Sequence, residues 1–237
     1  MLPAIERIPA DMGNLIATKS YFVLHAPRQS GKTTAIMSLV DRINEENKYY
    51  ALYCSFESLE RFTDPNKVLP WITLTVIQNM QISGIKELKD ACKDIQLFNP
   101  KNPDGLTDDG KIADAVSVSL TNSISSPMQS ICAKLDKPLL VFMDEIDTLS
   151  GDVLVSCLRQ LRNGYVLRSK IPFPNTIALV GLCNIRDYKA QIRLDSESLG
   201  TSSPFNIIKK AFTLANFSRE DVRTLYGQHT GETGQAF

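Results

Sequence analysis

The sequence has few of the residues that build zinc and disulfide sites. Two histidines and five cysteines occur among 237 residues, and no two cysteines form a CxxC pair, which argues against a zinc site. The cysteines are odd in number and dispersed, as is typical of reduced thiols, most of them in a core. A chain of this length can bury a core that needs no metal or disulfide for stability.

The sequence also lacks an excess of charge and a long apolar run. Twenty-six Lys and Arg residues balance twenty-six Asp and Glu residues, so no global field steers the protein toward nucleic acid or an anionic membrane, and only a local patch could do so. The longest apolar runs, 139–143 and 177–183, are too short to span a bilayer. Residues 1–15 include acidic side chains and no signal-peptide pattern. These features predict a cytoplasmic protein with no membrane partner.

Short apolar runs alternate with helical patterns, which favours a parallel sheet with helices on both faces. The predicted strands are 21–26, 49–56, 138–144, 176–182 and a weaker 211–214, of which the third and fourth are apolar enough to be central. Helices are predicted over 32–44, 68–80 and 152–164, with Trp71 in the core and Gly164 as a C-cap. A capping box at Ser218 and Asp221 begins a last helix that should weaken at Gly227 and hardly pass Gly231 and Gly234.

The strongest motif lies between the first predicted strand and the helix after it. Its residues fit the P-loop (Walker A) pattern: Ala26, Pro27, Arg28, Gln29, Ser30, Gly31, Lys32 and Thr33, followed by Thr34. Backbone N–H groups of such a loop cradle a phosphate, Lys32 reaches the β- and γ-phosphates, and the Thr33 hydroxyl ligates Mg²⁺. Thr34 is placed to touch the α-phosphate. Ala26 replaces the usual first glycine, which is tolerable only if that position needs no positive φ.

A second motif follows the third predicted strand. Asp144 ends an apolar run, so its carboxylate is expected at the carboxyl edge of the sheet, where it can hold Mg²⁺ (Walker B). Glu145 is placed to act as a general base on an attacking water. An Asp-Glu pair is typical of ATPases with an additional central strand rather than of GTPases. Asp147 either supports this site or simply begins a helix.

Two weaker signals have alternative interpretations. Asn184 or Arg186, just after the fourth predicted strand, could sense the γ-phosphate or could form a turn with no ligand contact. Four basic residues follow one another without an acid, namely Arg159, Arg162, Arg168 and Lys170. They could supply an arginine finger or a nucleic-acid contact, but a solvated helix face is the favoured interpretation. His25 is predicted to be buried with a hydrogen-bond partner rather than catalytic.

Four segments together resemble the bacterial AAA-like ATP-binding proteins, which are related to the STAND and archaeal-type ATPases: YFVLHAPRQSGKTT, LLVFMDEIDTLSGDVLVSCLRQLRNGY, IALVGLCNIRDYK and FSREDVRTLYGQHTGETGQAF. The resemblance implies a three-layer α/β P-loop NTPase domain over residues 1–217, with a parallel sheet of order 5-1-4-3-2, and the start of a truncated helical lid over 218–237. It implies ATP and Mg²⁺ as ligands. Cys183 and Asn184 depart from the family, which has Arg and Asp there.

The predicted function is therefore a Mg-ATP-binding ATPase that hydrolyses ATP slowly as a conformational or assembly switch. Its ligands would be ATP and ADP. The switch would act through self-association or through binding of a protein partner. Two alternatives remain open. One is a nucleotide-binding module, or a truncated remnant, that does not hydrolyse ATP. The other is a nucleic-acid-stimulated ATPase that uses the basic run over residues 159–170.

Overall fold

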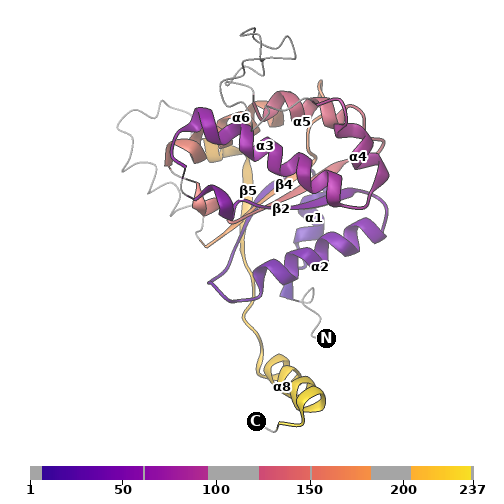
Figure 1. The fold of residues 1–237 in the computed structure, drawn as a ribbon, viewed down its shortest axis with the longest axis vertical. Helices are drawn as coiled ribbons and strands as arrows, with labels where there is room; N and C mark the ends of the chain where they lie inside the picture. The colour runs from indigo at the N-terminus through magenta and orange to yellow at the C-terminus, as the bar shows by residue number, and fades with distance from the viewer. Residues whose placement is uncertain (1–6, 61, 96–122, 150, 183–203, 236–237) are drawn as a thin grey trace, which may run out of the picture.

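The protein is built on a five-stranded parallel sheet (Figure 1). The computed structural model describes residues 7–60, 62–95, 123–149, 151–182 and 204–235. The strands are β1 Tyr21–His25, β2 Tyr50–Ser55, β3 Leu139–Asp144, β4 Thr176–Gly181 and β5 Ile208–Thr213. Their spatial order is β2-β3-β4-β1-β5, and every neighbouring pair is parallel. The predicted fold class, five strands and strand order are thus confirmed.

Helices cover both faces of the sheet (Figure 1). One face carries α1 (Met12–Ala17) and α2 (Lys32–Glu45), and the other carries α3 (Pro65–Ile82), α4 (Lys86–Cys92), α5 (Ser125–Cys132) and α6 (Gly151–Leu167). Because successive side chains of a strand point to opposite faces, β1 sends Tyr21 and Val23 toward α3–α6 and Phe22 and Leu24 toward α1 and α2. Short 3₁₀ turns lie at η2 (Glu57–Leu59), η4 (Ile146–Thr148) and η5 (Pro204–Ile207).

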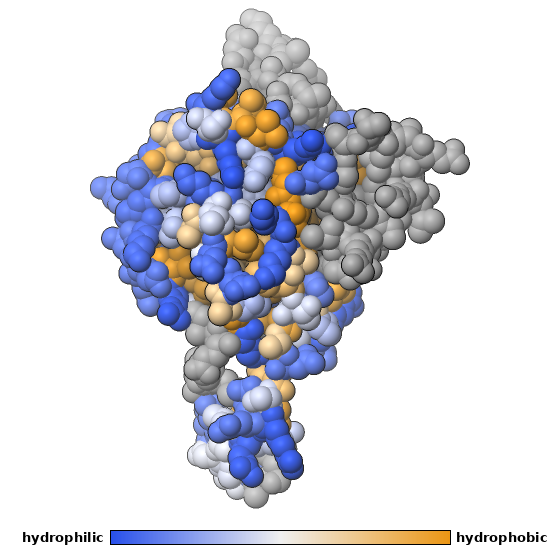
Figure 2. Space-filling model, turned by 180° about the vertical axis from the view of Figure 1, so that it is seen from behind, coloured by the Kyte–Doolittle hydropathy of each residue, from blue (hydrophilic) through white to orange (hydrophobic). Residues whose placement is uncertain are grey.

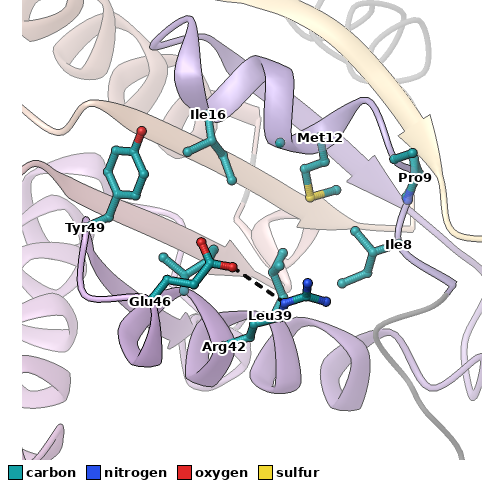
Figure 3. A pocket seen from close by; sticks show the side chains of 11 residues that line it. Ile8, Pro9, Met12, Ile16, Leu39, Arg42, Glu46 and Tyr49 are labelled. Atoms are coloured by element: carbon teal, nitrogen blue, oxygen red, sulfur yellow. Dashed lines mark ion pairs between the residues drawn. The ribbon is translucent and has the colours of Figure 1, made fainter.

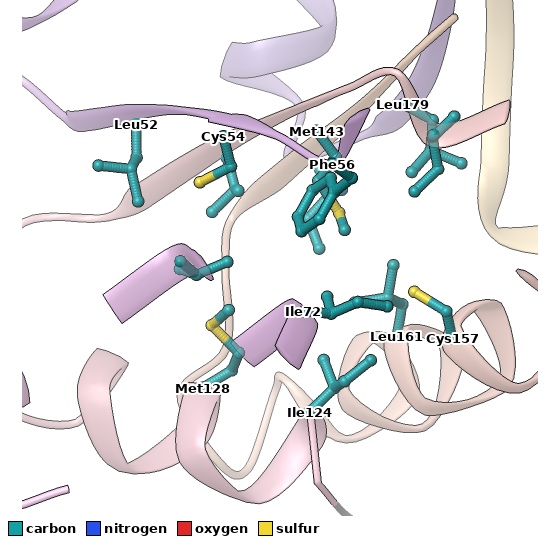
Figure 4. Packing of buried hydrophobic residues seen from close by; sticks show 14 of the residues in the cluster. Leu52, Cys54, Phe56, Ile72, Ile124, Met128, Met143, Cys157, Leu161 and Leu179 are labelled. Atoms are coloured by element: carbon teal, nitrogen blue, oxygen red, sulfur yellow. The ribbon is translucent and has the colours of Figure 1, made fainter. Parts of the chain in front are cut away.

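The larger of the two cores lies between the sheet and helices α3–α6 (Figure 4). Phe56, Ile72 and Leu161 pack there beside buried cysteine and methionine side chains. Among the four cysteines that the structure describes, all are free thiols and three are buried, as predicted. Burial raises the pKa of the Cys157 thiol, because a low-dielectric interior disfavours the thiolate. These thiols therefore belong to the packing.

Two predictions about α3 and α6 are wrong. Gly164 lies inside α6, three residues before its end at Leu167, and is not a C-cap. A Cβ atom at Gly164 would lie 2.3 Å from ring atoms of Phe173, so this glycine allows a close approach of the ring. Trp71 is 37% exposed, because α3 turns Val68 and Ile72 rather than Trp71 toward the core.

Within the described ranges, no helix is both long and apolar enough to cross a membrane.

The last helix, α8 (Arg219–Thr233), stands apart from the sheet (Figure 1). It begins at the predicted capping box, in which the side chains of Ser218 and Asp221 each bond the other's backbone N–H. It runs through Gly231, contrary to prediction, but as predicted it does not pass Gly234, whose φ of 72° gives it a left-handed C-cap. None of its residues is buried, and the face shown in Figure 2 is mostly hydrophilic.

Candidate functional site

The predicted site residues meet at the carboxyl edge of the sheet. The P-loop connects the end of β1 to α2, and Asp144 is the last residue of β3. Strand β4 lies between β1 and β3, so it is the additional central strand that the Asp-Glu pair predicts. In open α/β sheets, ligands bind outside this edge.

The P-loop backbone has the bends that a phosphate cradle requires. Gly31 has a φ of 71° and Gln29 a φ of 57°, both left-handed. Alternation of left-handed and ordinary residues turns successive N–H groups toward one point, where an anion can sit. Ala26 has no positive φ and is fully buried, and its N–H donates to the carbonyl of Gly181 at 3.2 Å. The alanine therefore extends the pairing of β1 with β4 and meets the condition under which it can replace glycine.

A buried charge cluster joins the P-loop to the end of β3. Lys32 is only 6% exposed, and its Nζ lies 3.3 Å from Oε1 of Glu145 and 3.6 Å from Oδ1 of Asp144. The Thr33 hydroxyl donates to Oδ2 of Asp144 at 2.9 Å. The structure thus brings together Lys32, Thr33, Asp144 and Glu145. One ammonium neutralises part of the charge of two adjacent carboxylates.

Tyr53 of β2 also belongs to this cluster and was missed in the sequence. Its hydroxyl donates to Oδ2 of Asp144 at 2.9 Å, while the N–H of Glu145 donates to Oδ1 of Asp144 at the same distance. Burial, followed by the negative charge of Asp144, raises the pKa of Tyr53, so its hydroxyl remains a donor. The only signal in the sequence is a tyrosine three residues before the end of the predicted strand over 49–56. The role of this tyrosine becomes visible only from the pairing of β2 with β3.

Glu145 has a strained backbone. Its φ and ψ are 56° and 37°, in the left-handed region that costs a residue with a Cβ atom on the order of 1 kcal/mol. The strained turn follows β3 directly and leaves the Glu145 carboxylate beside Lys32, with 30% of the side chain exposed. Strain of this kind is concentrated at functional sites, where the surrounding structure holds it.

Asp147 connects this turn to the neighbouring strand. It lies in η4, and its Oδ1 accepts the backbone N–H of Leu182 at 3.2 Å. Asp147 therefore supports the point where β4 ends. The two sensor candidates that follow, Asn184 and Arg186, lie outside the described residues.

The basic run and His25 have structural contacts. The Arg168 guanidinium lies 3.8 Å from the ring centroid of Tyr165, and its Nη1 donates to the carbonyl of Lys19. Arg168 thus holds α6 against the segment before β1. Arg159 and Lys170 are exposed, and Arg162 is partly buried. His25 is partly buried, with its Nε2 3.1 Å from the Thr213 hydroxyl.

Thr33 and Asp144 are the residues that can hold a metal ion. Hydroxyl and carboxylate oxygens are the ligands that Mg²⁺ prefers, and Mg²⁺ usually keeps waters and substrate oxygens as its other ligands. In the part of the chain that the structure describes, no three His, Cys, Asp or Glu side chains form a cluster that could hold a metal by themselves. The donor set therefore suits a cation that arrives with a phosphate ligand.

A cavity of about 360 Å³ lies elsewhere, between α1 and α2 (Figure 3). Its lining is mainly apolar, with Met12 and Ile16 facing Leu39, and the Arg42–Glu46 ion pair beside them at 3.6 Å. None of its lining residues belongs to the P-loop or to the Asp144 cluster. Since chemistry on a phosphate needs charged groups, we place the candidate site at the cluster.

Comparisons with known proteins give a fold but no family. No protein-family model and no curated protein matches the chain. A chain of Drosophila ORC bound to poly(dA/dT) DNA and Cdc6 is similar in structure, with a TM-score of 0.51 and 8% identity over 92% of this chain and 30% of that one. Drosophila ORC bound to GC-rich DNA and Cdc6 gives the same values. The Aeropyrum pernix Orc1 protein in complex with DNA has a TM-score of 0.49 and 13% identity over 95% of this chain and 50% of that one.

The two similarities with a TM-score of 0.51 agree with the α/β architecture described above. The chain has a three-layer α/β fold of the P-loop NTPase type. It spans half or less of the length of the solved chains that it matches. At such low identity the similarity concerns the fold alone, and the narrower bacterial family stays a prediction.

Proposed function

We propose that the protein binds ATP with Mg²⁺ at the P-loop and hydrolyses it slowly, as a conformational or assembly switch. The observation that carries this proposal is the cluster in which Lys32 contacts Asp144 and Glu145 at 3.6 Å and 3.3 Å and Thr33 contacts Asp144 at 2.9 Å. An anion cradle, a lysine, two oxygen ligands and a carboxylate base are the groups that phosphoryl transfer to water requires.

In the binding step, the P-loop N–H groups and the Lys32 ammonium hold the β- and γ-phosphates. Thr33 and Asp144 would hold Mg²⁺, which would supply positive charge to the same phosphate oxygens. The hydrogen bond from Tyr53 at 2.9 Å keeps the Asp144 carboxylate in place. Thr34, exposed at the start of α2, is available to the α-phosphate.

In the hydrolytic step, Glu145 orients a water and accepts its proton as the water oxygen attacks the γ-phosphorus and the bond to the ADP oxygen breaks. The ion pair at 3.3 Å between Glu145 and Lys32 has a consequence for this step. When Lys32 turns to the phosphates, Glu145 loses its partner and becomes free to hold the water. Substrate binding therefore activates the base. Either Asn184 or Arg186 would stabilise the charge on the γ-phosphate.

The switch would act through the part of the chain that follows the sheet. We interpret residues 1–217 as the ATPase core and α8 as the beginning of a helical lid. The position of that helix would depend on the bound nucleotide. A second copy of the chain or a partner protein would then bind the helix in one of its positions.

Nucleic-acid stimulation is the weaker alternative. The solved structures that resemble this chain are complexes with DNA, which favours testing it. In this chain, however, Arg168 of the basic run is engaged by Tyr165 and a backbone carbonyl. If DNA were an activator, turnover should rise on addition of duplex or single-stranded DNA and fall steeply with salt. No stimulation at low salt would reject the alternative.

Binding is tested by thermal unfolding with and without Mg-ATP. Ligand at about a hundred times its dissociation constant stabilises the native state by about 2.7 kcal/mol, a shift of roughly 5–10 °C for a chain of this size. The shift should disappear in Lys32→Ala and persist in Lys137→Ala, a lysine that lies in the turn before β3. Equal shifts in all three proteins would contradict a P-loop site.

Hydrolysis is tested with Glu145→Gln. This change keeps the size of the side chain and removes the base, so turnover should fall about 10²–10⁴-fold while nucleotide affinity survives. A wild-type protein that binds ATP but shows no turnover for the variant to lose would be the non-hydrolysing module instead.

A further inference from the structure

We propose that Arg7 is a phosphate-binding residue of the nucleotide site, and that the same guanidinium ties nucleotide occupancy to the segment that leads into α8. This inference rests on the proposed function, because it concerns the same ligand. It adds a residue that lies outside both motifs.

Arg7 joins the two ends of the described chain. Its Nε donates to the carbonyl of Ala215 at 2.9 Å, and its Nη2 donates to the same oxygen. The guanidinium carbon lies 3.8 Å from the ring centroid of Phe217, a cation–π distance. Arg7 is only 9% exposed. The guanidinium is therefore held in a fixed orientation by the segment between β5 and α8.

The third nitrogen of this guanidinium has no partner and lies at the P-loop. Nη1 of Arg7 is buried without a hydrogen bond and sits 3.1 Å from the point that a Cβ atom on Gly31 would occupy. Phe217 approaches the same point to 3.3 Å. Gly31 immediately precedes Lys32, so the free donor of Arg7 lies beside the P-loop.

A second buried polar atom, which belongs to the P-loop itself, lacks a partner. Three buried side-chain atoms in the described ranges have no hydrogen bond, namely Arg7 Nη1, Ser30 Oγ and Thr176 Oγ1. Ser30 directly precedes Gly31 in the P-loop, and Arg7 Nη1 lies 3.1 Å from the Cβ position of Gly31. Buried polar groups are nearly always hydrogen-bonded, so an unpartnered cationic donor beside the P-loop and an unpartnered hydroxyl within it imply an acceptor that binds there. A phosphate oxygen satisfies both, because a guanidinium is the side chain best suited to phosphate.

The contacts of Arg7 also explain how the ligand would reach α8. Phe217 directly precedes Ser218, the N-cap of α8, and α8 buries no residue of its own. Its position therefore depends on the segment over residues 215–217. A phosphate that fixes Arg7 also fixes the Ala215 carbonyl and the Phe217 ring, and hence the start of the helix. Asp221, in the first turn of α8, adds an electrostatic attraction to Arg7.

The experiment compares Arg7→Gln with Arg168→Gln as a matched control. Arg168 also stacks on an aromatic ring at 3.8 Å and donates to a backbone carbonyl, but its partners are Tyr165 and Lys19, at the other end of β1. Affinity for Mg-ADP is measured with a fluorescent ADP analogue. Amide hydrogen exchange of residues 215–221 is measured with and without saturating Mg-ADP.

Arg7→Gln should weaken Mg-ADP binding about 10–100-fold, the range for a hydrogen bond to a charged group. In the wild type Mg-ADP should slow exchange over residues 215–221, and at saturation in Arg7→Gln that slowing should be absent. Arg168→Gln should leave both observations unchanged. A purely structural Arg7 would instead lower the unfolding midpoint and leave the affinity for Mg-ADP as it is, which would overturn the proposal.

Two further outcomes are decisive. If Arg7→Gln does not fold, Arg7→Lys takes its place. Lysine keeps the positive charge but lacks the planar guanidinium and its several N–H donors. Unchanged affinity and unchanged protection in that variant would overturn the proposal. If the wild type itself binds no Mg-ADP, the proposed function fails first, and the phosphate role of Arg7 fails with it. Binding that Lys32→Ala abolishes and Arg7→Gln leaves intact refutes only the role of Arg7.

Discussion

Replacing Gly164 by alanine should destabilise the protein, although alanine is the better helix residue. Gly164 lies inside α6, so intrinsic helix propensity alone would make the exchange favourable by about 1 kcal/mol. The new methyl group would lie 2.3 Å from Cε2 and Cζ of Phe173, more than 1 Å inside ordinary contact. Phe173 is 7% exposed and packed in the larger core, so its ring has little room to move. Overpacking of this kind costs about 1–3 kcal/mol, which outweighs the gain in helix propensity, so we expect a net loss of up to about 2 kcal/mol.

The assay is urea unfolding followed by circular dichroism, with the free-energy change taken from the midpoint at an unchanged slope. Phe173→Leu removes the ring atoms that the methyl group would meet. The double variant should therefore be about 1–2 kcal/mol more stable than the sum of the two single changes predicts. Gly227→Ala is the control, since a Cβ atom there has no neighbour within 4 Å.

A Gly164→Ala cost that is the same with Phe173 and with Leu at position 173 would refute this explanation. A C-cap glycine, which the sequence pattern suggested, would produce that result. Its replacement costs about 1 kcal/mol through the left-handed backbone, whatever side chain lies nearby.

Two further predictions concern the site and α8. Tyr53→Phe removes the hydroxyl that donates to Asp144 at 2.9 Å. The Mg²⁺ concentration for half-maximal ATP turnover should therefore rise about tenfold. An unchanged Mg²⁺ concentration for half-maximal turnover would mean that Tyr53 does not position the metal ligand. The hydrogen bonds from Ser218 lower the pKa of Asp221 in the folded protein. The cap therefore stabilises α8 fully above the ordinary Asp pKa near 4, and this stabilisation is lost as the pH falls through the lower pKa of the folded state. Amide exchange over residues 219–223 should therefore speed up, relative to the intrinsic rate, on acidification below about pH 4 in the wild type. Asp221→Asn should show no such step.

The strands could be predicted from the sequence because buried parallel strands are nearly continuous apolar runs. β3 and β4 are buried at every position, and their runs contain few polar residues before the strand ends. β5 was the weakest prediction, since it is an edge strand whose outward residues Lys209 and Lys210 interrupt the pattern. The strand order came from the resemblance rather than from periodicity.

The candidate site was predictable where its residues follow a strand end. Lys32 and Thr33 follow β1, and Asp144 and Glu145 end or follow β3. Parallel strands place their carboxyl ends at one edge, so a local motif after each strand is enough to expect that they meet. The distances of 2.9 Å to 3.6 Å among them agree with that expectation.

Other contacts depended on the tertiary structure. Tyr53 reaches Asp144 because β2 pairs with β3 in one register, and Arg7 reaches Gly31 because the segment after β5 holds its guanidinium there. The absence of a side chain at Gly164 makes room for the ring of Phe173, which lies in the segment between α6 and β4. None of these pairs has a sequence spacing that a helix or strand period would reveal. Local pattern therefore determined the elements and the groups at their ends, whereas packing between distant segments decided which side chains support them.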